Sequence, residues 1–302
     1  MSSSGHIVAI GGGGFGRNPN EPVIEDYIVN LSPAKKPKIA FFPTASAENV
    51  QYIVNFYTAF TKLNCSPKNI SLFQKTPDLE SIIEESDIIY VGGGNTKSML
   101  AVFKEWGLDR LIINAYKEGK VLAGVSAGAI CWFEKGVTDS WESELKVLNC
   151  LGVLKGVCCP HYDGEANRRP SVEKFLKNKE LENCLCIEDG AAVHYQNEIL
   201  KTSISFYKDK NTYQVSCKKN QLIEKPLKYS LIVDDVVETG ITLRSFKDIE
   251  GANFFVLVSK KKPIWWNTVN LSHKNEWIVF PWENIENQLN EEKEFKSKRV
   301  LG

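Results

Sequence analysis

The stretch VLAGVSAGAICWF at residues 121–133 decides how the rest of the chain is interpreted. Its first residues are continuously apolar, as in a buried strand, and a glycine-flanked serine at 124–128 separates them from a helical segment. A strand, a sharp turn and a helix are the context of a nucleophile elbow. Glycines fit on both sides, because a side chain there would crowd a turn that strains the serine backbone. We expect Ser126 to project its hydroxyl from the strand end, with the Ala127 amide directed at an oxyanion.

A turn of small residues that only permits close packing is the alternative to a nucleophile elbow, so the other segments have to decide between the two.

The chain has 302 residues, 43% of them hydrophobic, which is enough for one large domain or two smaller ones. Lys and Arg together number 37 and so do Asp and Glu, and this balance favours neither nucleic acid nor an anionic membrane as a partner. No apolar run approaches the roughly 18 residues of a membrane span, and residues 1–5 carry no basic leader. We therefore expect a cytoplasmic protein without membrane contact.

The eight cysteines include no Cys-x-x-Cys pair, so we interpret them as reduced, mostly buried residues and expect no metal site.

A glycine run, GGGGFG at 11–16, follows the apolar strand at 7–10 and satisfies the spacing of a dinucleotide fingerprint. The next strand, at 38–42, ends in Pro-Thr-Ala-Ser without an acidic residue to hold a ribose. We therefore expect no nucleotide and no other cofactor.

Strands and helices alternate through the first part of the chain, which predicts a parallel sheet with helices on both faces. The expected strands are 7–10, 38–42, 70–73, 87–91 and the one before Ser126, and the expected helices are 47–63, 78–85, 96–105 and 108–117. In such sheets a ligand lies outside the carboxyl ends of the strands, where residues 11–14, 43–46, 92–95 and Ser126 would meet. Later segments give weaker signals: a loop at 136–144, a strand or hairpin at 151–157, a helix at 168–176, a broken strand at 185–193 and short strands over 195–225.

A serine nucleophile needs a base to take its proton. Among the four histidines, His6 lies in the first strand, His194 in an apolar run and His273 near the far end. His161 follows a strand and is flanked by proline and by polar turn residues, so it is the best candidate, although a histidine alone is more often structural.

Four motifs in this order resemble the peptidase E and cyanophycinase family of serine peptidases: VGGGNT at 91–96, GVSAGA at 124–129, Pro-His at 160–161 and Ile-Glu-Asp at 187–189. The resemblance covers about residues 5–225. It implies a class I glutamine-amidotransferase-like, flavodoxin-like α/β fold, with Ser126 as nucleophile, His161 as base, and an oxyanion held by the amides of Ala127 and of Gly93 or Gly94. It further implies cytoplasmic cleavage of small peptides or isoaspartyl-like bonds near an acidic residue, without metal or cofactor.

The family uses two different carboxylates to orient the histidine, and here they correspond to Asp139 and Glu188. We favour Glu188, because a strand end fixes a carboxylate better than a loop does. For an acidic substrate, Arg168 and Arg169 offer a cationic fork, with Asn95 as a further substrate-binding residue; the alternative is that both arginines face solvent at a helix start. The chain lacks the longer histidine-to-arginine segment of the aspartyl dipeptidases, which argues against strict specificity for amino-terminal aspartate.

Residues 226–302 do not share this resemblance, so we divide the chain into a peptidase-like domain at 1–225 and a second, small α/β segment. The stretch YSLIVDDVVETGITL at 229–243 resembles the phosphoribosyl-pyrophosphate motif of type I phosphoribosyltransferases, and WIVFPWE at 277–283 resembles the end of their xanthine-guanine branch. In that motif a strand presents two aspartates to ribose hydroxyls and a turn holds a phosphate, which here implies Asp234, Asp235, Thr239, Gly240 and Thr242.

The segment is too short to close a parallel sheet alone. We therefore expect it to dock on the first domain or to form a homo-oligomer with another chain, and to bind a ribose phosphate weakly or not at all. For the whole chain the sequence predicts a serine peptidase acting on small peptides. The competing hypothesis is a catalytically silent protein that keeps the pocket and binds a small molecule or phosphorylated sugar.

Overall fold

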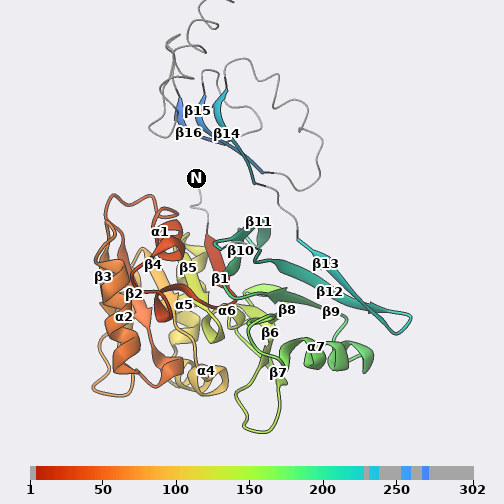
Figure 1. Cartoon of the computed structure of the whole chain (residues 1–302). Coiled ribbons are helices and arrows are strands. Elements are labelled where there is room, and N and C mark those ends of the chain that lie inside the picture. Colours follow the sequence, from red (N-terminus) through yellow and green to blue (C-terminus); the bar gives the residue numbers. More distant parts are fainter. Residues whose placement is uncertain (1–4, 208, 228–230, 238–252, 260–266, 272–302) are drawn as a thin grey trace, which may run out of the picture. The chain divides into compact units, whose positions relative to one another are not determined.

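The computed structural model describes residues 5–207, 209–227, 231–237, 253–259 and 267–271. The chain divides into two compact units, Met1–Lys228 and Tyr229–Gly302. Figure 1 shows the elements of both units in sequence colours.

The first unit contains a seven-stranded sheet in the order β11-β10-β1-β5-β4-β2-β3. Neighbouring strands from β1 to β3 in this order run parallel, whereas β10 and β11 add an antiparallel edge. The strands are β1 (His6–Ile10), β2 (Lys38–Phe42), β3 (Ser66–Asn69), β4 (Ile88–Val91), β5 (Val121–Val125), β10 (Ala191–Gln196) and β11 (Ile199–Ser205). The third strand therefore precedes the expected 70–73, because residues 66–69 pair with β2 and the chain turns after them.

Helices cover both faces of this sheet, as the alternation predicts. Alternate residues of each strand point to opposite faces, so Ile7 and Ala9 join one apolar core, and Val8 and Ile10 join the other. The first core packs against α3 (Leu79–Glu85), α4 (Thr96–Glu105) and α5 (Leu108–Lys117), and the second against α1 (Val23–Val29) and α2 (Val50–Phe60). Side chains of Asn49, Asp78 and Asn95 cap α2, α3 and α4 by accepting a backbone hydrogen bond three residues on, which fixes where these helices begin.

A second sheet of six strands, which the sequence did not predict as a separate layer, follows the elbow in the order β13-β12-β9-β8-β6-β7. It comprises β6 (Phe133–Thr138), β7 (Lys146–Asn149), β8 (Leu154–Cys159), β9 (Asn183–Ile187), β12 (Thr212–Lys218) and β13 (Gln221–Pro226), and α7 (Arg168–Lys177) packs on it. The expectation of one parallel sheet is therefore corrected to two mixed sheets with helices. The expected loop at 136–144 overlaps the end of β6, and β7 was not predicted, because glycine and charged residues interrupt the apolar pattern of 133–149.

Three parallel strands, β14 (Leu231–Val237), β15 (Asn253–Ser259) and β16 (Asn267–Leu271), are the described part of the second unit. Asp234 and Asp235 lie within β14 and not at its end. Thr239, Gly240 and Thr242 lie outside the described residues.

Within the described ranges, no helix is both long and apolar enough to cross a membrane. All eight cysteines lie in those ranges as free thiols, and six of them are buried. Burial raises the pKa of the Cys158 thiol well above its usual range, so it is an inert, neutral core residue.

Candidate active site

Ser126 occupies a strained turn between β5 and the short helix α6 (Ala127–Ile130), with φ 57° and ψ −113°. Both flanking glycines are needed for this turn. A Cβ added to Gly124 would lie 2.2 Å from the carbonyl oxygen of Gly128, and one added to Gly128 would lie 2.0 Å from that of Val91. The elbow expected from the sequence is therefore present, and its serine stands at the carboxyl end of a central strand.

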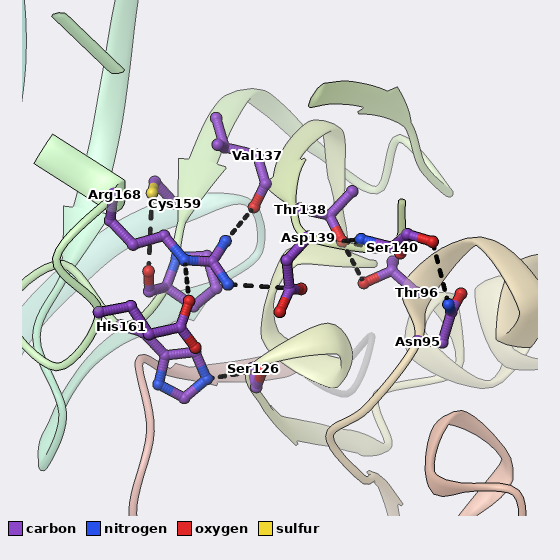
Figure 2. Close-up of polar contacts among 12 residues, drawn as sticks. Asn95, Thr96, Ser126, Val137, Thr138, Asp139, Ser140, Cys159, His161 and Arg168 are labelled. Atoms are coloured by element: carbon purple, nitrogen blue, oxygen red, sulfur yellow. Dashed lines mark hydrogen bonds and ion pairs between the residues drawn. The ribbon is translucent and has the colours of Figure 1, made fainter. Parts of the chain in front are cut away.

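His161 lies directly against this serine. Its Nε2 is 2.8 Å from the Oγ of Ser126, and Figure 2 shows the hydroxyl and the imidazole pointing toward each other. The other ring nitrogen, Nδ1, lies 2.6 Å from Oδ1 of Asp189. The three side chains form one continuous chain of hydrogen bonds.

The charge state of Asp189 fixes the direction of these hydrogen bonds. Burial by itself raises the pKa of this carboxyl, but hydrogen bonds and positive charge from His161 and Arg17 outweigh that effect and lower it to about 2. An ionised carboxylate can only accept, so Nδ1 of His161 carries the proton. In the neutral form of the imidazole, Nε2 then accepts the hydroxyl proton of Ser126.

The glycine run at 11–16 supports the histidine and the aspartate. The Gly11 carbonyl accepts the His161 amide at 3.2 Å, and the Gly12 carbonyl accepts the Gly190 amide at 2.8 Å. A Cβ on Gly12 would lie 1.9 Å from Oδ1 of Asp189 and 2.6 Å from Nδ1 of His161. Close approach of the backbone to this pair therefore accounts for glycine at position 12.

The expectation that Glu188 orients His161 is wrong. Its carboxylate lies 3.2 Å from Arg169 and accepts the Asn211 amide at 2.9 Å. Both residues lie just beyond the end of β9 (Asn183–Ile187), where Asp189 forms an isolated β-bridge with Gly12 and its side chain and that of Glu188 turn to opposite sides. Asp189 stands in the Ile-Glu-Asp motif quoted for the resemblance, and this alternation was the signal that could have distinguished the two carboxylates.

Asp139 is not the partner of His161 either. Its side chain is 60% exposed, and its Oδ1 lies 3.5 Å from the Arg168 guanidinium. Arg168 also donates to the Val137 carbonyl at 3.0 Å and to Glu165 at 2.7 Å, as Figure 2 shows in part. Arg168 is only 1% exposed, so it braces the strand and turn around the site and cannot meet a substrate carboxylate. Its predicted role in substrate binding is corrected accordingly.

Arg169 is also occupied. Its guanidinium contacts Glu188 and Glu224 and lies 4.2 Å over the ring of Tyr162, so two carboxylates already neutralise it. The Asn95 side chain caps α4 through Ser98 and donates to the Ser140 carbonyl at 3.2 Å. These contacts give Asn95 a structural role, and its role in substrate binding stays a prediction.

A second glycine run, at 92–94, follows β4 and borders Ser126. A Cβ on Gly93 would lie 3.2 Å from Cβ of Ser126, and Gly94 has φ 134° with the Ala45 carbonyl 2.1 Å from its added Cβ. The Gly93 amide donates to the Tyr52 hydroxyl at 3.2 Å, whereas the Ala127 amide, at the first position of α6, has no acceptor within the helix. Gly93 and Ala127 are thus adjacent to Ser126, whereas Gly94 packs against Ala45, and the Gly93 amide is engaged by a tyrosine that the sequence did not single out.

No cluster of metal-ligating side chains occurs in the part of the chain that the structure describes. A cavity of about 210 Å³ lies at the opposite, amino ends of β2 and β3, lined by residues such as Lys38, Pro67 and Ile82. It contains no nucleophile paired with a base, so the chemistry is assigned to the strand ends around Ser126.

Comparison with solved structures agrees with this fold. The chain superposes on the crystal structure of a peptidase E-like protein from Listeria monocytogenes EGD-e with a TM-score of 0.52 at 19% identity, over 68% of this chain and 100% of that one. A peptidase from an acI-B1 actinobacterium gives a TM-score of 0.55 at 16% identity, over 74% and 96% of the two chains. At these identities the match concerns the fold alone.

Sequence comparison identifies the family. The model of peptidase family S51 matches residues 7–203. The uncharacterised peptidase YgaJ of Bacillus subtilis (strain 168) is 46% identical over 222 residues, which are 73% of this chain and 96% of that protein. Peptidase E of Citrobacter koseri is 36% identical over 110 residues, 35% of this chain and 48% of that protein. The chain that carries this serine and histidine therefore belongs to peptidase family S51 and is a serine-type peptidase.

Proposed function

We propose that this peptidase hydrolyses small peptides, in the manner of a dipeptidase, through a triad of Ser126, His161 and Asp189 on a class I glutamine-amidotransferase-like fold. The observation that carries the proposal is the continuous hydrogen-bond chain from the strained serine through the imidazole to an ionised carboxylate. A nucleophile, a base and a group that orients the base are the elements that acyl transfer by serine requires.

Each group has a defined task in this mechanism. His161 takes the proton of the Ser126 hydroxyl at Nε2 while Oγ attacks the peptide carbonyl, and Asp189 stabilises the imidazolium that forms. The amides of Ala127 and of the Gly93–Gly94 run stabilise the oxyanion. His161 then gives its proton to the leaving amine, and water attacks the acyl-enzyme with His161 again as base.

Small peptides are the proposed substrate class, and the environment of the two arginines gives no support to a preference for acidic residues. Arg168 is buried and Arg169 is neutralised by two carboxylates. We therefore expect activity on several dipeptides and not a requirement for amino-terminal aspartate.

Labelling with a fluorophosphonate tests the activated serine directly, because only an activated serine reacts. The wild type and the control Ser81→Ala, which alters an exposed residue of α3, should be labelled, and Ser126→Ala should not. The same three proteins should then be assayed on a dipeptide panel that includes aspartyl and β-aspartyl substrates. Full peptide hydrolysis by Ser126→Ala would refute the mechanism, and an unlabelled wild type would favour the catalytically silent binding protein.

For residues 226–302 the reported matches offer no support for a phosphoribosyltransferase, since the family model ends at residue 203 and the named relatives are peptidases. We keep the prediction that this segment does not transfer phosphoribosyl groups and binds a ribose phosphate weakly or not at all. Titrating the full chain and its Asp234→Asn, Asp235→Asn double variant with phosphoribosyl pyrophosphate tests it. Micromolar binding that the double variant loses would contradict the prediction.

A further inference from the structure

Arg17 makes the second contact to the carboxylate of the proposed triad. Its Nη1 lies 2.5 Å from Oδ2 of Asp189, while Oδ1 of the same carboxylate faces His161. With one oxygen on each partner, the carboxylate cannot rotate without breaking a charge-assisted hydrogen bond. The sequence motifs did not indicate Arg17, because it follows the glycine run at 11–16 and lies in none of the four motifs that resemble the family.

The backbone that carries Arg17 is anchored on two sides. Gly13 and Gly14, with φ values of 95° and 64°, turn the chain into the short 3-10 helix η1 (Gly14–Gly16), and the Arg17 amide closes the turn on the Gly14 carbonyl at 3.0 Å. Within this turn the Phe15 amide donates to the buried Glu25 carboxyl at 2.7 Å. The Phe15 ring is fully buried and stacks on Tyr52 with a centroid distance of 5.0 Å.

Other neighbours also restrict the position of the Asp189 side chain. Its amide donates to Oδ1 of Asp163 at 2.8 Å, and an added Cβ on Gly12 or on Gly164 would collide with its carboxylate oxygens. The charged neighbours are therefore His161, Arg17, Asp163 and, through its ion pair with Asp163, Lys210. Arg17 is the only one of these cations that the structure places directly on the carboxylate, apart from His161 when protonated.

We propose that Arg17 is a positioning residue of the catalytic apparatus, which holds Asp189 so that its other oxygen meets Nδ1 of His161. The inference rests on the proposed triad. Arg17 acts through Asp189, on the carboxylate oxygen that does not face His161, so we expect it to contribute to turnover and not to substrate binding. Loss of outer partners that orient a functional group typically costs about 10- to 100-fold, and we expect this range for Arg17→Gln.

The experiment compares Arg17→Gln with Lys38→Gln. Lys38 also forms an ion pair, with Glu85, and its side chain is 57% exposed, close to the 58% of Arg17. It lies at the opposite end of the sheet from the site. Three experiments are made on the full chain: steady-state kinetics (kcat and KM) for a peptide with a free or an amidated carboxyl terminus, the rate of fluorophosphonate labelling, and the far-downfield proton resonance of the imidazole Nδ1–H. The last two need no substrate, so they report on Arg17 even if the peptide assay fails.

Arg17→Gln should lower kcat and the labelling rate by about 10- to 100-fold, leave KM nearly unchanged for both peptides, and shift or broaden the downfield resonance. Lys38→Gln should change none of them. Wild-type labelling and an unshifted resonance in folded Arg17→Gln would overturn the proposal. A rise in KM confined to the peptide with a free carboxyl terminus would also overturn it, because Arg17 would then bind substrate and not position Asp189.

Discussion

Nδ1 of His161 lies 2.6 Å from Asp189, whereas the adjacent residue, Glu188, turns its carboxylate to Arg169 and to the Asn211 amide. Two neighbouring carboxylates therefore have separate functions. We propose that Asp189 orients the base, whereas Glu188 fastens the segment at 211 to the end of β9. Exchanging each acid for its amide distinguishes these functions.

Asp189→Asn should lower kcat by about 10⁴, as when the aspartate of a serine-protease triad becomes an amide and the imidazole takes the wrong tautomer. Glu188→Gln should retain most activity, because the amide oxygen can still accept from Asn211, and its effect should appear as a lower melting temperature. Steady-state kinetics and thermal unfolding of both variants make the comparison. An inactive Glu188→Gln beside an active Asp189→Asn would contradict the assignment.

The sequence predicted the elbow and the helices that begin with a capping side chain, because these depend on local patterns, whereas His161 was chosen from four histidines by its turn context and by the family resemblance. Helices expected at 96–105 and 108–117 are α4 and α5. Turn geometry at Ser126 is likewise local, since the glycines that permit it are its neighbours in the chain.

What the sequence could not provide depends on contacts between distant residues. Asp189 and Glu188 carry the same functional group. They differ in which side of the chain their side chains point to, and this depends on how the segment after β9 lies against the glycine run at 11–16. Arg168 is a charged residue at a helix start, a pattern typical of solvent exposure, yet it is buried because Val137, Asp139 and Glu165 surround its guanidinium. The second sheet was missed for a similar reason, since β6 and β8 pair across a gap in sequence and their residues are only partly apolar.

Gly12→Ala should abolish most activity while leaving the chain folded. Gly12 does not have a left-handed backbone conformation, so the expected fault is the new methyl group, which would lie 1.9 Å from Oδ1 of Asp189. The carboxylate or the imidazole must then move, and small misplacements of catalytic groups cost about 10²-fold.

Gly152→Ala is the control for this variant. Gly152 has φ 72° and open space around its Cα, so alanine there strains the backbone without touching the site. It should lower stability by about 1 kcal/mol and leave kcat unchanged. If Gly12→Ala keeps wild-type kcat in a folded protein, the glycine run does not constrain the His161–Asp189 pair.

Tyr52→Phe should strengthen stabilisation of the oxyanion, because the single N–H of Gly93, which donates to the Tyr52 hydroxyl and lies beside Ser126, is then released for the oxyanion. We expect kcat to rise about 2- to 10-fold and the affinity for a peptide boronic acid, which forms a tetrahedral adduct, to rise similarly. Tyr57→Phe is the matched control, since this tyrosine of α2 also binds a backbone amide and a side chain, those of Asn69. Equal kinetics for the two variants would show that the Tyr52 hydroxyl has no part in the reaction.

His194 should make the folded state less stable in acid. It is buried, with its ring nitrogens 2.9 Å from His6 and 2.7 Å from the Tyr27 hydroxyl, and burial, assisted by His6 and Lys201, lowers its pKa to about 4. Between pH 6.5 and 4 the unfolded chain therefore binds a proton that the folded chain does not. This lowers the free energy of unfolding by on the order of 3 kcal/mol as pH falls through that window.

Glu25 has the opposite effect on stability in acid, so the test compares the His194→Gln variant with the wild type. Burial raises the pKa of this carboxyl to about 7, and between pH 4.5 and 7 the folded chain binds the extra proton, which favours folding as pH falls. His194→Gln removes only the histidine contribution. Urea unfolding at pH 7 and at pH 4.5 should show a smaller loss of stability on acidification in His194→Gln than in the wild type, and an equal loss in both would mean that His194 is not the group that takes up the proton on unfolding.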